Sequence, residues 1–477
     1  MLARLNPFRS LPNPREVWAW GMYDLANQSF TLLIITLLFS LYVQQVVTPH
    51  PALTPEQADA IRAAIQTQTS LTPELESLRR SVELADRSGA FHWSLMHGGS
   101  LILVVLLSPV IGALADIRGW RKQVLIGTGI ACAALTCALG LVGPGQLLLA
   151  ALLYIPANLC YQIGENFLAS FLPDVSTPRN IGRVSATGWT MGYVGALLLL
   201  VAALIGMIAF DLRSVTQWRP LFVFAGLWFA VNMIPTILFL RDDAPQPEAG
   251  SLGLIRASIG RVLETVTHTS HYRQLALFLT AFLIYGFGVQ VVIGFASIIA
   301  KSFGFEQTDL VIFVAQITVT AGVAAFGTGR FQDAIGAKTT VLIYLLVWML
   351  SCGGLVAVKL IWPVHGPQWP LWVIGNGLGF GLGGIGTASR SMVGRLTPRH
   401  RTAEFFGLWG VSYKLAGALG VLSFGAVARA FGELASLCLL FGFFVVGFLL
   451  VLPVDEIAGV RAARRAERAR LNSSKNT

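Results

Sequence analysis

Long apolar segments follow one another along the whole chain, and they constrain its fold more than any other feature. A helix needs about 20 apolar residues to cross a bilayer, and twelve segments of this kind occur. Only 12% of the residues are charged, which excludes an ordinary soluble domain. We therefore expect an all-α integral membrane protein with twelve transmembrane helices. The expected spans are 17–47, 91–115, 122–143, 146–171, 182–208, 219–240, 273–299, 308–332, 339–361, 370–394, 403–428 and 433–453.

An internal repeat divides the chain into two similar halves. The turn pattern D-x-x-G-x-[RK] occurs twice, 217 positions apart, and a shift of 220 positions places Trp189 on Trp409 and Tyr193 on Tyr413. We expect two pseudo-symmetric six-helix bundles related by an axis along the membrane normal. The turn residues are Asp116, Gly119, Arg121 and Lys122 in the first copy and Asp333, Gly336 and Lys338 in the second.

The repeat and the loop lengths give an expected domain organisation. The N-terminal bundle should cover residues 1–240 and the C-terminal bundle residues 273–455, followed by a basic tail at 456–477. Apolar residues at helical spacing in the linker 241–272 predict an amphipathic helix at the membrane surface. In the outer loop 48–90, Thr54 three residues before Gln57 predicts a helix N-terminus. This loop is either a packing cap or a substrate lid.

Basic residues indicate the orientation in the membrane. With the N-terminus in the cytoplasm, 23 of the 34 Lys and Arg residues fall on the cytoplasmic side and 9 in outer loops. The positive-inside rule then places both termini in the cytoplasm. This topology accounts for the net charge of +10, so no nucleic-acid partner is expected. Arginines of the tail could contact anionic lipid headgroups.

Motifs for cofactors, metals and catalysis are not found. The five cysteines fall inside expected spans without metal-ligand spacing, and His268 and His271 have no third ligand nearby. The Gly379-x-Gly381-x-x-Gly384 pattern lies within an apolar span instead of following a strand. We therefore expect no enzyme activity, metal or bound cofactor. An ion gradient, with protons as first choice, would supply the energy for any active process.

Four ionisable residues fall inside the expected spans, where charges are costly and therefore candidates for function. The acids Asp24 and Glu165 lie in the first half, and the bases Arg390 and Lys414 lie in the second. This segregation suits a zwitterion, and it equally suits groups that exchange a proton. Salt bridges that only hold the bundles together are the alternative. The candidate set for substrate binding and proton coupling is Asp24, Asn27, Tyr161, Glu165, Arg390, Tyr413 and Lys414.

Several segments resemble a known transporter family. Residues 112–122 resemble the loop 2–3 signature of the major facilitator superfamily, and the second turn resembles its loop 8–9 counterpart. Residues 23–30, 182–193, 389–391 and 404–407 resemble the vacuole-effluxer branch, linked to autophagic amino-acid efflux, and its bacterial relatives. The resemblance covers the transmembrane part but not the outer loop. Helix 5 lacks the Gly-Pro pair typical of drug antiporters in this superfamily.

The resemblance implies roles for the sites. In such transporters helices 1, 4, 7 and 10 line a central cavity, and Asp24, Glu165 and Arg390 fall on three of these helices. The duplicated turns would latch the two bundles together in the outward-facing state. A static helix terminus with snorkelling bases is the alternative for these turns.

We therefore expect a secondary active transporter of a small polar organic solute, with an amino acid or similar zwitterion as first choice. It would work by alternating access, as a monomer in the plasma (inner) membrane, in contact with membrane lipids. An exporter of an amphipathic drug or lipid is one alternative. A transceptor or scaffold without net transport is the alternative from another class.

Overall fold

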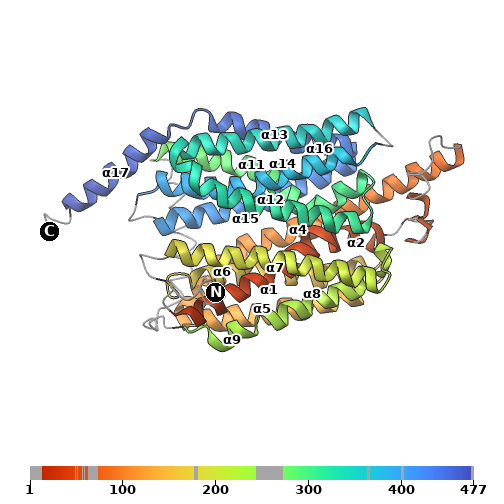
Figure 1. The fold of residues 1–477 in the computed structure, drawn as a ribbon, viewed down its shortest axis with the longest axis horizontal. Helices are drawn as coiled ribbons and strands as arrows, with labels where there is room; N and C mark the ends of the chain where they lie inside the picture. Colours follow the sequence, from red (N-terminus) through yellow and green to blue (C-terminus); the bar gives the residue numbers. More distant parts are fainter. Residues whose placement is uncertain are drawn as a thin grey trace, which may run out of the picture. The chain divides into compact units, whose positions relative to one another are not determined.

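The computed structural model describes most of the chain, and helices make up nearly all of what it describes (Figure 1). No strand occurs among the described residues. The chain divides into two compact units, Met1–Ser251 with Gly294–Ala315, and Leu252–Ile293 with Gln316–Thr477. The expected linker helix, together with His268 and His271, lies outside the described residues. The structure describes residues 13–48, 50, 52–55, 57–58, 60–62, 73–176, 181–242, 272–362, 366–398 and 402–473.

Unit 1 contains the helices of the first half of the chain. Its first span consists of α1, the π-helical segment η2, α2 and the π-helical segment η3. Pro235 interrupts the sixth span between α8 and α9, because proline cannot donate a backbone hydrogen bond. The bounds are α1 Pro14–Gln28, η2 Ser29–Leu37, α2 Phe39–Tyr42, η3 Val43–Val47, α4 Pro73–Arg118, α5 Arg121–Ala138, α6 Leu147–Ser170, α7 Ile181–Ala209, α8 Arg219–Asn232 and α9 Ile234–Phe239.

The second span extends well beyond its expected start. Helix α4 begins at Pro73, within the expected outer loop, and runs without a break for 46 residues. The capping pattern at Thr54 is confirmed: its backbone N–H donates to Gln57 Oε1 at 2.9 Å, and the Gln57 N–H donates to Thr54 Oγ1 at 3.3 Å. Arg62 then pairs with Asp86 of α4 at 2.6 Å. The outer segment is thus tied to the extended helix.

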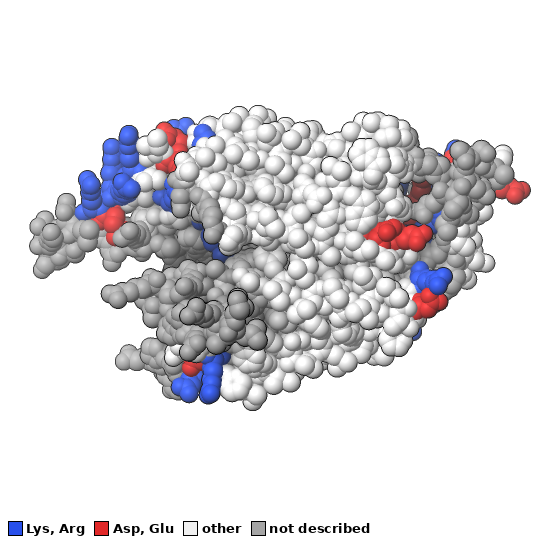
Figure 2. Space-filling model, viewed as in Figure 1, with Lys and Arg blue, Asp and Glu red and all other residues white. Residues whose placement is uncertain are grey.

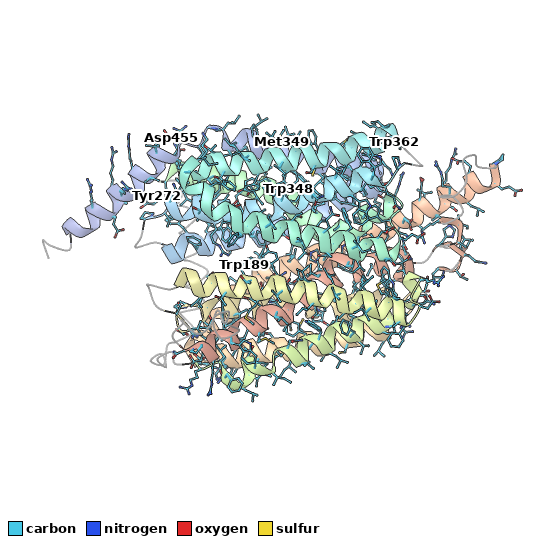
Figure 3. The ribbon with its side chains drawn as sticks, viewed as in Figure 1. Trp189, Tyr272, Trp348, Met349, Trp362 and Asp455 are labelled. Carbon is cyan, nitrogen blue, oxygen red and sulfur yellow. The ribbon has the colours of Figure 1, made fainter. Side chains whose placement is uncertain are left out.

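Unit 2 contains most of the second half. Parts of α11 and α12 belong to unit 1 instead, where Trp93 Nε1 donates to the Gly294 carbonyl at 2.7 Å and Ser40 Oγ lies 2.9 Å from Ser297 Oγ. In Figure 3, Trp348 lies among the helices of unit 2, and its ring stacks on Phe444 at 4.6 Å. The bounds are α11 Arg273–Ser302, α12 Gln307–Ile335, α13 Ala337–Ile361, α14 Trp369–Leu396, α15 Thr402–Phe431, α16 Glu433–Val451 and α17 Glu456–Ser473.

Eleven described helices are long and apolar enough to cross a membrane. They correspond to eleven of the twelve expected spans, and the remaining one corresponds to α14, a helix of 28 residues. The many glycines of α14 lower its mean hydropathy, although its length suffices for a bilayer. On the face shown in Figure 2, charged side chains of each unit gather at the ends of its helices. This distribution is that of a multi-pass membrane protein.

The glycines of α14 allow close packing against its neighbours. A Cβ at Gly383 would overlap the backbone of Ala321 in α12, and one at Gly381 would lie 2.8 Å from Trp348 Nε1 in α13. A Cβ at Gly386 would meet no atom within 4 Å. Small residues let helix backbones approach in a membrane, where no hydrophobic effect drives helices together. Gly381 and Gly383 therefore serve the packing of α14, whereas Gly386 lies in open space.

We predict that Gly383→Ala lowers the apparent free energy of unfolding by about 1–3 kcal/mol, because the added methyl group must push α14 away from α12. Gly386→Ala is the matched control, and it should leave stability unchanged or slightly raised, since alanine favours helix. Thermal melting of the detergent-solubilised protein measures both. Equal melting temperatures for the two variants would contradict this packing account.

Candidate functional site

The first site lies in unit 1 and joins α1 to α6. We call Asp24, Asn27 and Glu165 the acidic site. Asn27 is almost completely buried, and its Nδ2 donates a hydrogen bond to Glu165 Oε1. Its Oδ1 accepts from Gln28 Nε2 at 3.2 Å, which fixes the orientation of the amide. Both acids are half-buried, and Asp24 lies within electrostatic reach of Glu165. Three of the seven predicted substrate and coupling residues are thus brought together.

Glycines of α7 cover the acidic site at close range. A Cβ at Gly188 would lie 2.7 Å from a ring carbon of Trp20 and 3.0 Å from Asp24 Oδ2. A Cβ at Gly192 would lie 3.5 Å from Gln28 Nε2. These distances leave no room for a side chain at Gly188. The backbone of α7 itself therefore forms one wall beside the carboxylate.

Tyr161 extends the polar contacts along α6. Its hydroxyl accepts from Thr31 Oγ1 at 2.8 Å, and its ring lies 5.1 Å from that of Phe30. Thr31 belongs to η2, which begins directly after Gln28. π-helical turns within α-helices are rare and are frequent at functional sites. The irregular part of the first span thus adjoins the acidic site.

A second site lies in unit 2, where α11, α14 and α15 meet. We call Arg390, Lys414 and the rings of Phe282, Trp409 and Tyr413 the basic site. The Arg390 guanidinium carbon lies 5.7 Å from the centre of the Trp409 ring, and Lys414 Nζ lies 6.0 Å from that of Tyr413. Phe282 contacts both rings, at 5.5 and 6.3 Å. Cations held over aromatic faces can bind an anionic group next to an apolar surface.

The repeat-related aromatic pairs have the same geometry in both units. The rings of Trp189 and Tyr193 lie 6.4 Å apart at an angle of 35°, and those of Trp409 and Tyr413 lie 6.4 Å apart at 34°. The pair in unit 1 has no lysine at the following position, whereas Lys414 follows Tyr413. The two aromatic pairs therefore share one geometry, but a charged residue follows only the pair in unit 2.

The first Asp-Gly-basic turn forms ion pairs and a hydrogen bond with acids near the ends of other helices in unit 1. Gly119 adopts a φ of 65°, which glycine tolerates without strain, and α5 starts at Arg121. Arg121 pairs with Asp174 and, at 3.1 Å, with Asp242. Asp242 Oδ2 also accepts from the backbone N–H of Lys122 at 3.2 Å. A carboxylate at a helix N-terminus is stabilised by the helix dipole.

The second turn follows the same plan in unit 2. Gly336 adopts a φ of 89°, and α13 starts directly after it. Glu456 accepts from the backbone N–H of Lys338 at 2.9 Å and pairs with Arg395 at 3.1 Å. Lys338 Nζ donates to the Leu452 carbonyl at 2.7 Å. In both units, an acid that follows the last span therefore caps the helix after the turn.

Asp116 and Asp333 lie in α4 and α12, and their side chains are outside the described part of the structure. The residues that sequence analysis missed are Asp174, Asp242 and Glu456 at the turns and Phe282 and Trp409 in the basic site. Asp242 and Glu456 could have been predicted from the sequence, because an acidic pair follows the last span of each half, at 242–243 and 455–456.

The fold is the one found in solved transporters of the major facilitator superfamily. The chain is similar to the nucleoside transporter NupG, with a TM-score of 0.61 and 12% identity over 93% of this chain and 98% of that structure. It is also similar to a bacterial homologue of the human lysosomal transporter Spinster, inward-facing and unoccupied, with a TM-score of 0.55 and 16% identity over 97% and 98%. At such identities the likeness shows the fold alone.

The chain belongs to the Atg22-like vacuole effluxer family, whose model matches residues 12–464. YxiO of Bacillus subtilis strain 168, described as an uncharacterized MFS-type transporter, is 22% identical over 450 residues, which cover 92% of this chain and 94% of YxiO. Autophagy-related protein 22-1 of Aspergillus fumigatus is 27% identical over 325 residues, 63% of this chain and 53% of that protein. The chain thus spans about half the length of this fungal relative. The expected superfamily and branch are confirmed, and the relatives are transporters, not enzymes.

We predict that Glu456→Ala lowers the apparent free energy of unfolding by about 1–3 kcal/mol, because it leaves the Lys338 N–H and Arg395 without their shared acceptor. Glu83→Ala is the control, since Glu83 is half-exposed and pairs with Arg79 at 3.7 Å. Loss of such a surface pair should cost at most about 1 kcal/mol. Melting curves of the solubilised variants measure the difference. A Glu456 variant as stable as the control would contradict a structural role for this cap.

Proposed function

We propose that this protein is a proton-coupled secondary transporter that moves an amino acid or a similar zwitterion by alternating access. Membership of the Atg22-like effluxer family supports transport, and the family's description favours efflux. One observation carries the solute class: the half-buried acids lie in unit 1, and the bases with their aromatic rings lie in unit 2. The ammonium group of the solute would bind the acidic site, and its carboxylate would bind the basic site.

Protons are the proposed coupling ion because the acidic site contains two carboxylates that interact with each other. A carboxylate in such a setting can hold a proton in one state and release it in another when its neighbours change. Asn27 can donate to an ionised Glu165, so it supports the deprotonated form. Binding of a solute ammonium group would favour the same form. Solute and proton would therefore compete for one site, which is the simplest basis for coupling.

The duplicated turns are proposed to act as latches between the bundles. Asp116 and Asp333 would supply the carboxylates, while Gly119, Arg121, Lys122, Gly336 and Lys338 form the turns. The caps by Asp242 and Glu456 support this role, because they hold each turn in a defined geometry. The protein would work as a monomer in the plasma (inner) membrane, surrounded by lipid, with both termini in the cytoplasm.

Purified protein in vesicles with an imposed pH gradient tests the proposal. We expect at least one of the twenty common amino acids to accumulate against its gradient, and Asp24→Asn and Glu165→Gln to abolish the accumulation. The amides keep the volume of the carboxylates but cannot release a proton. Glu306→Gln is the matched control, since Glu306 is an exposed acid at the edge of α12. It should transport at the rate of the unmodified protein.

The outcomes separate the proposal from its rivals. Accumulation of amphipathic drugs or lipids, but of no amino acid, would favour an exporter of such compounds. A flat response to all solutes by protein with an intact melting transition would favour a transceptor or scaffold. Full gradient-driven accumulation by both amide variants would contradict the coupling role of the acidic site.

A further inference from the structure

Three helices of unit 2 form a closed ring of contacts that includes Arg390. Tyr285 of α11 bonds to Ser389 of α14 at 2.8 Å, and Ser389 is the residue before Arg390. Arg390 lies over Trp409 of α15, Trp409 contacts Phe282 of α11 at 5.5 Å, and Phe282 meets Tyr285 edge-on at 5.4 Å. The hydrogen bond of Tyr285 is a polar link between α11 and α14 within this ring.

The direction of this hydrogen bond follows from its surroundings. Ser389 Oγ donates its proton to the Ile385 carbonyl, 2.6 Å away in the same helix. The serine oxygen is therefore left to accept, and the Tyr285 hydroxyl donates. Both residues are about 1% exposed, so water does not compete for the bond. A buried hydrogen bond of this kind fixes the rotation of α14 relative to α11 at the position next to Arg390.

We propose that Tyr285 and Ser389 are positioning residues for Arg390. They hold its guanidinium over the Trp409 ring, where it receives the carboxylate of the solute. This inference rests on the proposed function for the identity of the ligand, but the positioning itself does not. Tyr285 and Ser389 do not touch the solute. They act by setting the rotation of α14.

The same unit contains a matched pair away from Arg390. Tyr344 of α13 bonds to Thr328 of α12 at 2.5 Å, and Thr328 Oγ1 also lies 2.6 Å from the Ala324 carbonyl of its own helix. Tyr344 and Thr328 are as buried as Tyr285 and Ser389. Tyr344 also packs against Phe380 of α14, but its hydrogen bond joins α13 to α12 and includes none of the residues of the ring around Arg390. Removal of the Tyr344 hydroxyl thus removes a comparable buried hydrogen bond.

The first experiment measures transport of the amino acid that the unmodified protein accumulates best. We expect Tyr285→Phe and Ser389→Ala each to raise KM by about three- to tenfold, with kcat changed less than about twofold, because the loss is one hydrogen bond that acts on binding. The double variant should be no worse than either single variant, since all three lack the same bond. Tyr344→Phe should melt at a similarly lowered temperature but keep its KM.

The second experiment needs no transported solute. Phenylglyoxal modifies exposed arginines, and Arg390 is exposed, so peptide mapping gives its modification rate. We expect this rate to change by about threefold or more in Tyr285→Phe and Ser389→Ala, and to stay unchanged in Tyr344→Phe. An altered rate without any amino-acid transport would refute the proposed solute and uphold the positioning. Equal effects of Tyr344→Phe and Tyr285→Phe, additive effects in the double variant, or unchanged Arg390 reactivity would each overturn it.

Discussion

The hydrogen bond from Asn27 to Glu165 holds the acidic site together, and the proposed binding of solute and proton depends on it. It satisfies a carboxylate inside an apolar bundle, where an unpaired charge would cost several kcal/mol. It also links α1 to α6, and Gly188 of α7 lies close to Asp24 beside it. An amide is suited to this task because it can donate to the carboxylate and accept from Gln28 at the same time. Asn27 thereby links the carboxylate of Glu165 to the polar side chains of α1.

The two halves of the chain share a frame and differ in chemistry. The tryptophan–tyrosine pairs at related positions have almost identical geometry, and in each unit an acid after the last span caps the helix that follows the turn. Duplication therefore accounts for the scaffold. It does not account for the difference in charge, since the acids lie in unit 1 and the bases in unit 2. This asymmetry is the feature that a solute with two opposite charges would require.

Sequence patterns predicted the features that depend on nearby residues. Apolar length predicted the spans, and the Thr54–Gln57 spacing predicted the observed cap. The π-helical segment after Gln28 was not predictable, because its apolar sequence fits an α-helix equally well and tertiary packing decides. Glu456 was missed because its partners Lys338 and Arg395 are distant in sequence. Phe282 was missed because one phenylalanine in an apolar span carries no signal of its neighbours.

We propose that solute and proton use the acidic site in turn. The most direct measurement is the proton movement that a solute evokes, followed with a pH-sensitive dye inside vesicles that contain the purified protein. Addition of a transported amino acid should produce a pH change that tracks the solute flux, and Glu165→Gln should abolish the pH change. Solute flux at an undiminished rate with no change of internal pH would contradict the account.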